Sequence, residues 1–343
     1  MFTRFVIYYV QLPEKEGIPL PETSVVLPLE IQPPVQSYQH HAFWLSMILG
    51  NDPDMRPWLT MHYTNLMWDA QEQMLNPYIY SDWRFETEQL LPTKFLVNVP
   101  PKMVQGYRSF DLVALLCDML DHGFYQMGTF DEFYVPAKSG YQKRHFVHNN
   151  LIYGYDSDAQ QFLSIGYTKN RIYEPFTVSY TDYVESVYHL HQRFIGALFC
   201  FYQPNAACRF DPDRYRCVLH DYVMSANKGS VENGYGLGCL EKTAADLSEA
   251  DERAALDLRP LRVILEHARM TYEGLAHLQE TGVRADPTSY ARAITCAETA
   301  LNLGIKFHMV RDPGLLQKAA GQIREMIRIE QELLLPLAAE KDV

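Results

Sequence analysis

The chain has 343 residues, of which 47% are hydrophobic and 21% charged, and its formal net charge is −12. This composition excludes an intrinsically disordered chain and is that of a globular protein, with length for one large domain or two ordinary ones. The acidic balance argues against nucleic acid as a partner, because proteins that bind a phosphate backbone usually present a basic face.

The sequence also indicates the cellular compartment that we expect for the protein. The N-terminal segment MFTRFVIYYVQLPEKEG has no apolar core followed by a small-residue cleavage site, so we expect no signal peptide. No apolar stretch is long enough for a membrane span. We therefore expect a cytoplasmic protein without membrane contact, whose thiols are reduced and buried, since none is in a CxxC spacing. The six cysteines are Cys117, Cys200, Cys208, Cys217, Cys239 and Cys296.

The first half of the chain predicts helices on either side of irregular segments. Residues 18–36 are rich in proline and β-branched residues and predict extended structure. Residues 38–49 predict a buried helix that ends at the sequence Gly-Asn-Asp-Pro, and residues 58–75 predict a second helix. Residues 111–122 have apolar residues at helical spacing and predict a helix terminated by Gly123.

After Gly123 the hydrophobic period changes to that of strands. Residues 124–135, 145–155 and 161–167 are three β-type segments separated by turn sequences, which predicts an antiparallel meander. We expect this meander to pack against the helix that starts near Tyr38. Residues 181–201 predict a helix again, with Ser179 or Thr181 as its N-cap.

The last third predicts a helical region. Residues 202–260 are interrupted by glycines and Pro204, and residues 233–238 (NGYGLG) predict a loop and the start of a helix rather than a nucleotide site, because the spacing is not GxGxxG. Residues 261–281, 287–309 and 313–338 have helical patterns. The expected architecture is thus an α+β domain over residues 1–225 followed by a C-terminal helical region over residues 226–343.

One segment resembles a known family. In residues 145–156 (HFVHNNLIYGYD) a histidine enters an apolar strand, and a Gly-Tyr-Asp turn follows six residues later. This resembles the histidine strand of papain-like cysteine enzymes, particularly the double-glycine bacteriocin peptidases and the N-terminal domain family of the butirosin-biosynthesis acyltransferase. Residues 261–278 are similar to the helical tail of that group. The resemblance implies a papain-like fold in which His148 is the general base.

The sequence departs from that family at the other catalytic positions. When residues 45–49 (LSMIL) are placed on the family's pattern, His40 falls where the nucleophilic cysteine belongs. The carboxylate or amide that orients the base is expected near Ile165 and Gly166, and glycine has no side chain for this role. Cys117 precedes the histidine strand but lies mid-helix at an apolar position, where a thiol is normally inert.

The candidate site follows from these positions. We expect His40 or His41 to lie within side-chain reach of His148, and one of the adjacent acids Asp131 and Glu132 to face it while the other faces solvent. Tyr153 and Tyr155 flank Gly154 and are candidates for ligand contact or for cross-strand packing. The candidate catalytic residues are His148, His40, His41 and Asp131, and the candidate substrate-binding residues are Tyr38, Tyr134, Tyr153 and Tyr155.

Three functions remain open. The resemblance implies a degenerate or repurposed papain-like protein of thiotemplated (nonribosomal-peptide-type) specialised-metabolite biosynthesis, which acts on or docks with an acyl or peptidyl group on a carrier protein. It implies acyl transfer or amide formation without a cofactor, and a local basic patch for an acidic carrier would comprise Lys138, Lys143 and Arg144. The alternatives are a non-catalytic binding or scaffold protein, and a metal-dependent enzyme built on His40 or His41 with His148 and Asp131. The spacing of these residues is not that of a metal motif, because His145 and His148 point to opposite faces of a regular strand.

Overall fold

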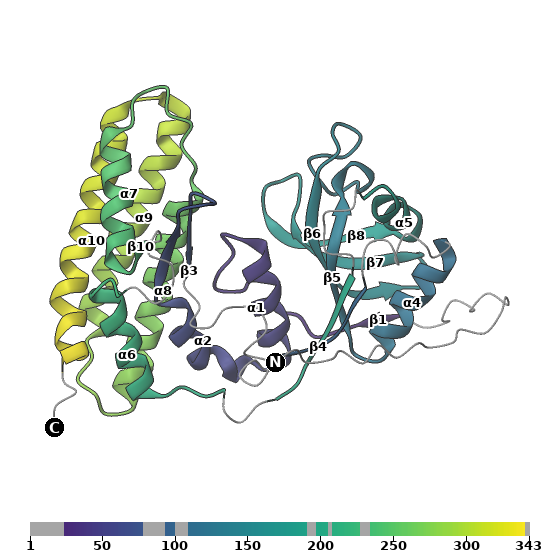
Figure 1. Cartoon of the computed structure of the whole chain (residues 1–343), viewed down its shortest axis with the longest axis horizontal. Helices are drawn as coiled ribbons and strands as arrows, with labels where there is room; N and C mark the ends of the chain where they lie inside the picture. The colour runs from purple at the N-terminus through teal and green to yellow at the C-terminus, as the bar shows by residue number, and fades with distance from the viewer. Residues whose placement is uncertain are drawn as a thin grey trace, which may run out of the picture. The chain divides into compact units, whose positions relative to one another are not determined.

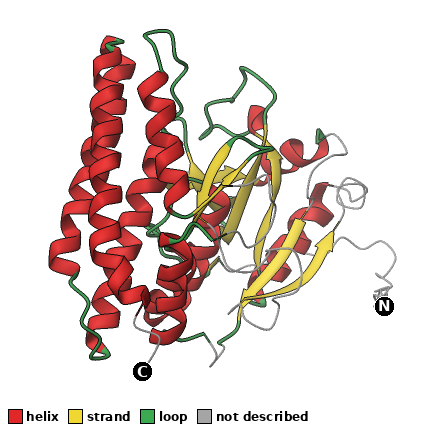
Figure 2. Cartoon of the chain, turned by 60° about the vertical axis from the view of Figure 1, so that its left-hand side comes forward, coloured by secondary structure: helices red, strands yellow, loops and turns green. Residues whose placement is uncertain are grey.

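The structure, a computed structural model, describes residues 24–77, 93–99, 109–190, 197–204, 208–226 and 234–339. Helices and antiparallel strands are both present, as Figure 1 and Figure 2 show, which confirms the expected α+β class. The chain forms two compact units: unit 1 comprises residues 1–27 and 95–201, and unit 2 comprises residues 28–94 and 202–343. This division differs from a single boundary at residue 225, because residues 28–94 belong with the C-terminal helices. The N-terminal segment, for which we expect no signal peptide, lies outside the described residues.

Unit 1 is built on a seven-stranded sheet in the order β4-β9-β5-β6-β7-β8, with β1 paired to β6. Strands β5 to β8 follow one another as antiparallel neighbours, so the predicted meander is confirmed. A β-bulge between Ile152 and Gly154 shifts the register of β6 against β7. The strands are β1 (Val25–Val26), β4 (Thr93–Val99), β5 (Tyr125–Asp131), β6 (Val147–Asp156), β7 (Gln161–Tyr167), β8 (Tyr173–Ser179) and β9 (Ala197–Tyr202).

Two helices pack their apolar sides into the core of unit 1. They are α4 (Ser109–Asp121) and α5 (Tyr180–Tyr188), and the short 3₁₀ helix η2 (Glu132–Tyr134) follows β5. Helix α4 ends at Gly123, whose φ of +82° suits glycine. Ser179 is the N-cap of α5, because its Oγ accepts a hydrogen bond from the Asp182 N–H.

The predicted helix over residues 181–201 is wrong from residue 197 onward. Residues 197–202 form β9, which pairs with β5 through the register Phe199 opposite Gln126. The segment ALFCFY is uniformly apolar, and an apolar run of this length fits a buried strand as well as a buried helix.

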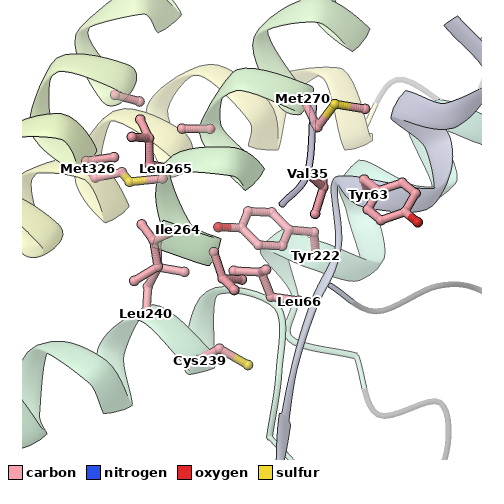
Figure 3. Close-up of a cluster of buried hydrophobic side chains, with 14 of the residues drawn as sticks. Val35, Tyr63, Leu66, Tyr222, Cys239, Leu240, Ile264, Leu265, Met270 and Met326 are labelled. Atoms are coloured by element: carbon pink, nitrogen blue, oxygen red, sulfur yellow. The ribbon is translucent and has the colours of Figure 1, made fainter. Parts of the chain in front are cut away.

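Unit 2 is mainly helical. Its first helices are α1 (Gln39–Asn51), η1 (Pro53–Met55) and α2 (Arg56–Tyr63), followed later by α6 (Pro212–Val223), α7 (Leu237–Glu249), α8 (Arg259–Glu280), α9 (Pro287–Val310) and α10 (Pro313–Ala339). The buried helix from Tyr38 and the three C-terminal helices are confirmed to within two residues at either end. Figure 3 shows part of the core that they share, in which Tyr222 lies among Leu66, Ile264 and other apolar side chains.

A small antiparallel sheet replaces the end of the second predicted helix. Strands β2 (Leu66–Asp69) and β3 (Met74–Pro77) form a hairpin, and β10 (Gly234–Tyr235) pairs with β2. The turn between β2 and β3 is stabilised by Asp69, whose Oδ1 accepts hydrogen bonds from the Gln71 and Glu72 N–H groups, and it includes Gln73 with a φ of +51°. The predicted helix over residues 58–75 is thus wrong beyond Tyr63.

The start of α7 agrees with the sequence. Gly236, with a φ of +55°, precedes the helix, and a Cβ at this position would lie 2.0 Å from the Tyr222 carbonyl oxygen. The glycines of this segment therefore serve a close backbone approach. Across the part of the chain that the structure describes, no helix combines the length and hydropathy of a membrane span.

Candidate functional site

His148 and Glu132 form a hydrogen-bonded pair in unit 1. His148 lies on β6 opposite Phe130 of β5, and its Nδ1 is 2.9 Å from Glu132 Oε1. The carboxylate is almost completely buried, whereas 35% of the imidazole side chain is exposed. A carboxylate can only accept here, so Nδ1 carries the proton and Nε2 is left as the basic nitrogen. This is the geometry that a general base and its orienting carboxylate have in a catalytic triad.

The orienting carboxylate comes from a different element than the sequence pattern suggests. The position after the hairpin is Gly166, as expected, but Glu132 on η2 supplies a carboxylate from the other side of the histidine strand. The 3₁₀ turn that begins after Asp131 ends the strand alternation, so adjacent acids no longer point to opposite faces. Both acids are buried, and the expectation that one of them faces solvent is wrong.

Asp131 contacts His145 and not His148. Its Oδ2 is 2.6 Å from His145 Nδ1, and its Oδ1 accepts hydrogen bonds from the Phe133 and Phe146 N–H groups. Asp131 thereby caps η2 and fixes the chain that enters β6. The structure thus pairs His148 with Glu132. This corrects the expectation that Asp131 is the acid that acts together with His148.

A buried lysine lies close to Glu132. Only 2% of Lys138 is exposed, and its Nζ donates a hydrogen bond of 2.7 Å to the Tyr167 carbonyl oxygen. The ammonium group is 4.4 Å from the centre of the Phe176 ring and 5.5 Å from that of Phe130. Burial lowers the pKa of Lys138 to about 8, and the nearby Glu132 charge acts in the opposite direction. Lys138 is therefore not part of an exposed basic patch.

Gly140 allows the loop that follows η2 to pack closely against the Glu132 carboxylate. A Cβ on Gly140 would lie 3.1 Å from Glu132 Cβ and 3.2 Å from the Arg144 carbonyl oxygen. These contacts are tighter than ordinary van der Waals contacts, so a side chain at this position would push the loop away from Glu132. The glycine thus helps to keep the Glu132 carboxylate buried.

Aromatic rings surround the exposed side of the two histidines. The His145 ring stacks on Phe133 with centroids 4.4 Å apart, and the His148 ring is 5.2 Å from Phe146. Tyr134, a predicted substrate-binding residue, lies on η2 with its ring stacked on His189 at 4.9 Å. Tyr134 is therefore near His145, with the two ring centroids 6.1 Å apart.

The other two tyrosines of the strand differ from each other. Tyr155 is completely buried opposite Phe162, and its hydroxyl donates a hydrogen bond of 2.6 Å to Asp121 Oδ1. It has the position of a packing residue, the second of the two roles considered for it. Tyr153 is half-buried, and its carbonyl oxygen accepts a hydrogen bond from the Leu27 N–H.

His40, His41 and Tyr38 belong to unit 2. Tyr38 precedes α1, and its hydroxyl donates a hydrogen bond of 2.9 Å to the Leu75 carbonyl oxygen. His41 is buried against Tyr63, and burial lowers its pKa well below the ordinary value, whereas His40 is exposed. The two imidazole rings are neighbours, with their centroids 4.3 Å apart. Because His148 is in unit 1, its proximity to His40 or His41 stays a prediction, as does the packing of the meander on α1.

The cysteines are not activated. None of the six forms a disulfide, and five are buried. Burial raises the pKa of Cys117 to about 11 and that of Cys239 to about 12. A reactive thiol requires a lowered pKa and partial exposure, so neither cysteine has the properties of a nucleophile.

A second histidine–carboxylate pair lies in the core of unit 2. Glu330 Oε1 is 3.0 Å from His267 Nε2 and accepts a hydrogen bond of 2.6 Å from Tyr290, while Oε2 accepts one of 2.7 Å from Tyr222. His267 Nδ1 is 2.5 Å from the Thr64 carbonyl oxygen. Both the histidine and glutamate side chains are buried, so this network joins α6, α8, α9 and α10 and is closed to substrate.

Comparisons with known proteins give no further assignment. No protein-family model matches the sequence, and no curated protein matches it significantly. Within the described residues, no group of three or more histidine, cysteine, aspartate or glutamate side chains is arranged to hold a metal ion.

Proposed function

We propose that this protein is a papain-like protein without a cysteine nucleophile that acts on a carrier-bound acyl or peptidyl group in thiotemplated biosynthesis. The observation that carries the proposal is the His148–Glu132 pair on an antiparallel sheet, with Nε2 of a partly exposed imidazole left as a base. The histidine strand β6, which ends with Gly-Tyr-Asp as paired strand residues rather than as the expected turn, supports the papain-like assignment. The raised thiol pKa values support a mechanism without cysteine.

The chemistry that this site suits is direct aminolysis of a thioester. The amine nitrogen of an acceptor attacks the thioester carbonyl carbon, the C–N bond forms and the C–S bond breaks. His148 Nε2 takes the proton that the amine nitrogen loses, and it can return that proton to the departing thiolate. Glu132 stabilises the imidazolium in between, so no acyl-enzyme is needed.

Exposed basic residues near this site suit an acidic carrier. Lys143 and Arg144 are exposed on the loop that follows Gly140. The backbone N–H of Lys169 donates a hydrogen bond of 2.8 Å to the Ala137 carbonyl oxygen, which brings a second turn, with exposed Lys169 and Arg171, to the same loop. In a chain with a net charge of −12, this local positive charge favours association with an acidic partner.

The experiment is amide formation from an acyl-pantetheine thioester and a primary amine, with wild type and His148→Gln. The matched control is His122→Gln, which removes an exposed histidine at the end of α4. We expect amide formation in wild type and His122→Gln and its loss in His148→Gln. If all three proteins bound the thioester and none formed the amide, the result would contradict catalysis and support the non-catalytic binding function instead.

A further inference from the structure

Two buried amide side chains lie on the same sheet face as His148. Gln126 on β5 and Asn150 on β6 are both fully buried. The register places Phe130 opposite His148, Gly128 opposite Asn150 and Gln126 opposite Ile152. Directly opposite residues share a face of the sheet, and alternate residues along a strand do so as well. Both amides therefore follow His148 along one face toward the interior.

The polar atoms of these amides are unsatisfied. Nε2 and Oε1 of Gln126 and Nδ2 and Oδ1 of Asn150 are buried without a hydrogen-bond partner in the described part of the chain. Buried polar side-chain atoms are nearly always hydrogen-bonded, and each one left unpaired destabilises the folded protein. Two such residues side by side mark a place where a ligand with both donors and acceptors would be bound.

Asn150 has no side chain directly opposite it on this face of the sheet. Its direct cross-strand neighbour is Gly128, which presents no side chain on that face. The diagonal neighbour is Gln126, whose Cα is expected about 7–8 Å away. A group between the two amides would thus be bound by both, since each side chain provides one carbonyl acceptor and two N–H donors.

The position relative to His148 indicates the chemistry of the ligand. Exposure falls along β6 from His148, which is 35% exposed, to Asn150, which is fully buried. Two strand residues span about 6.6 Å. A peptide chain extends by about 3.3–3.6 Å per residue, so an amide one or two residues beyond the reacting carbonyl would lie at Asn150 when that carbonyl lies at His148.

We propose that Gln126 and Asn150 form a binding subsite for a secondary amide in the acyl chain, so that the substrate is a peptidyl thioester rather than a simple fatty acyl thioester. This inference rests on the proposed function for the position of the reacting carbonyl. A subsite that hydrogen-bonds an amide rejects an alkyl chain of equal length, because the alkyl chain leaves the buried amides unpaired.

The experiment compares two pantetheine thioesters with acyl chains of equal length, N-acetylglycylglycyl and octanoyl. Dissociation constants are measured by isothermal titration calorimetry for wild type, Gln126→Met, Asn150→Leu and His148→Gln. The matched control is Asn149→Leu, because Asn149 is an exposed residue of the same strand on the opposite face. Circular dichroism melting verifies that each variant is folded.

We expect wild type to bind the peptidyl thioester on the order of 100-fold more tightly than the octanoyl thioester. The preference persists in Asn149→Leu and His148→Gln and is lost in Gln126→Met and Asn150→Leu. Equal affinities in wild type, no binding of either thioester, or an unchanged preference in both amide variants would overturn the subsite. Turnover that survives in His148→Gln while the preference is intact would instead contradict the proposed function alone.

Discussion

Glu132 Oε1 lies 2.9 Å from His148 Nδ1, although the two residues are 16 positions apart in the sequence. The contact depends on η2, which turns Glu132 toward β6 immediately after β5 ends. The buried carboxylate is next to Lys138, so that a positive charge and a histidine flank the same acid.

Burial of Lys138 should make the free energy of unfolding increase as the pH rises above about 8. Its folded-state pKa of about 8 is below the unfolded value of 10.5, so between these values the unfolded chain binds more protons than the folded one. Stability due to this group is therefore lowest below pH 8 and recovers as the pH rises. The free energy of unfolding of wild type relative to Lys138→Met should increase by up to about 3 kcal/mol from pH 8 to 10.5.

The measurement is urea unfolding of both proteins across that range. Lys143→Met, which removes an exposed lysine of the same loop, is the control and should show no such trend. A constant difference between wild type and Lys138→Met would show that Lys138 is not desolvated in the native protein.

His62 should make unit 2 sensitive to acid. The side chain is buried with its ring centroid 4.2 Å from that of Trp58, and burial lowers its pKa to about 3. Between pH 6.5 and 3 the unfolded chain takes up a proton that the folded one does not, so stability is lost as the pH falls through this window. His62→Phe should lose less stability than wild type between pH 6.5 and 4 in thermal unfolding. The exposed His308→Gln is the control, and an equal loss in His62→Phe and wild type would contradict the prediction.

The Glu330 network should be a major source of stability for unit 2. Removal of the Tyr222 or Tyr290 hydroxyl by substitution with phenylalanine leaves part of a buried carboxylate unpaired, so each should cost about 1–3 kcal/mol of unfolding free energy in urea. Glu332→Gln removes an exposed acid of the same helix and should change stability by less than about 0.5 kcal/mol. A change in unfolding free energy near zero for both tyrosine variants would mean that the Glu330 network does not stabilise unit 2.

Iodoacetamide should leave function intact. Burial raises the pKa of the thiols of Cys117, Cys208 and Cys239 to about 11 or 12, so the reactive thiolate is scarce at neutral pH. Mass spectrometry of the treated native protein should find adducts at most on the partly exposed Cys217, and thioester binding should be unchanged. A single stoichiometric adduct at Cys117 that abolishes function would reveal a cysteine nucleophile and contradict a mechanism without one.

The parts of the fold that the sequence predicts well have strong local signals. Helices α9 and α10 begin at Pro287 and Pro313 and have sustained apolar periodicity, and the meander strands are separated by turn sequences. Strand β9 has a weaker signal, because Gly196 is the one glycine or proline in the sequence between α5 and this apolar run. Helix α6 begins at Asp211 as N-cap followed by proline, which is a recognisable helix start. The glycines and Pro204 of residues 202–260 make this helix hard to predict.

The site was predictable only in part. The histidine strand identifies His148, but its partner depends on a three-residue 3₁₀ helix whose boundaries no periodicity indicates. The burial of Lys138 is also a tertiary effect, since the loop closes over it through Gly140 and the Tyr167 carbonyl. The amides of Gln126 and Asn150 become conspicuous only when the strand register places them on the face of His148.

The most direct test of the account is the rate of thioester aminolysis in Glu132→Gln and Asp131→Asn, measured from pH 6 to 9 under saturating thioester. Because Glu132 orients His148 whereas Asp131 holds His145, we predict a loss of about 10²- to 10⁴-fold for Glu132→Gln and a loss of less than about tenfold for Asp131→Asn. Equal losses in the two variants, or full activity in Glu132→Gln, would contradict the assignment of His148 and Glu132 as the catalytic pair.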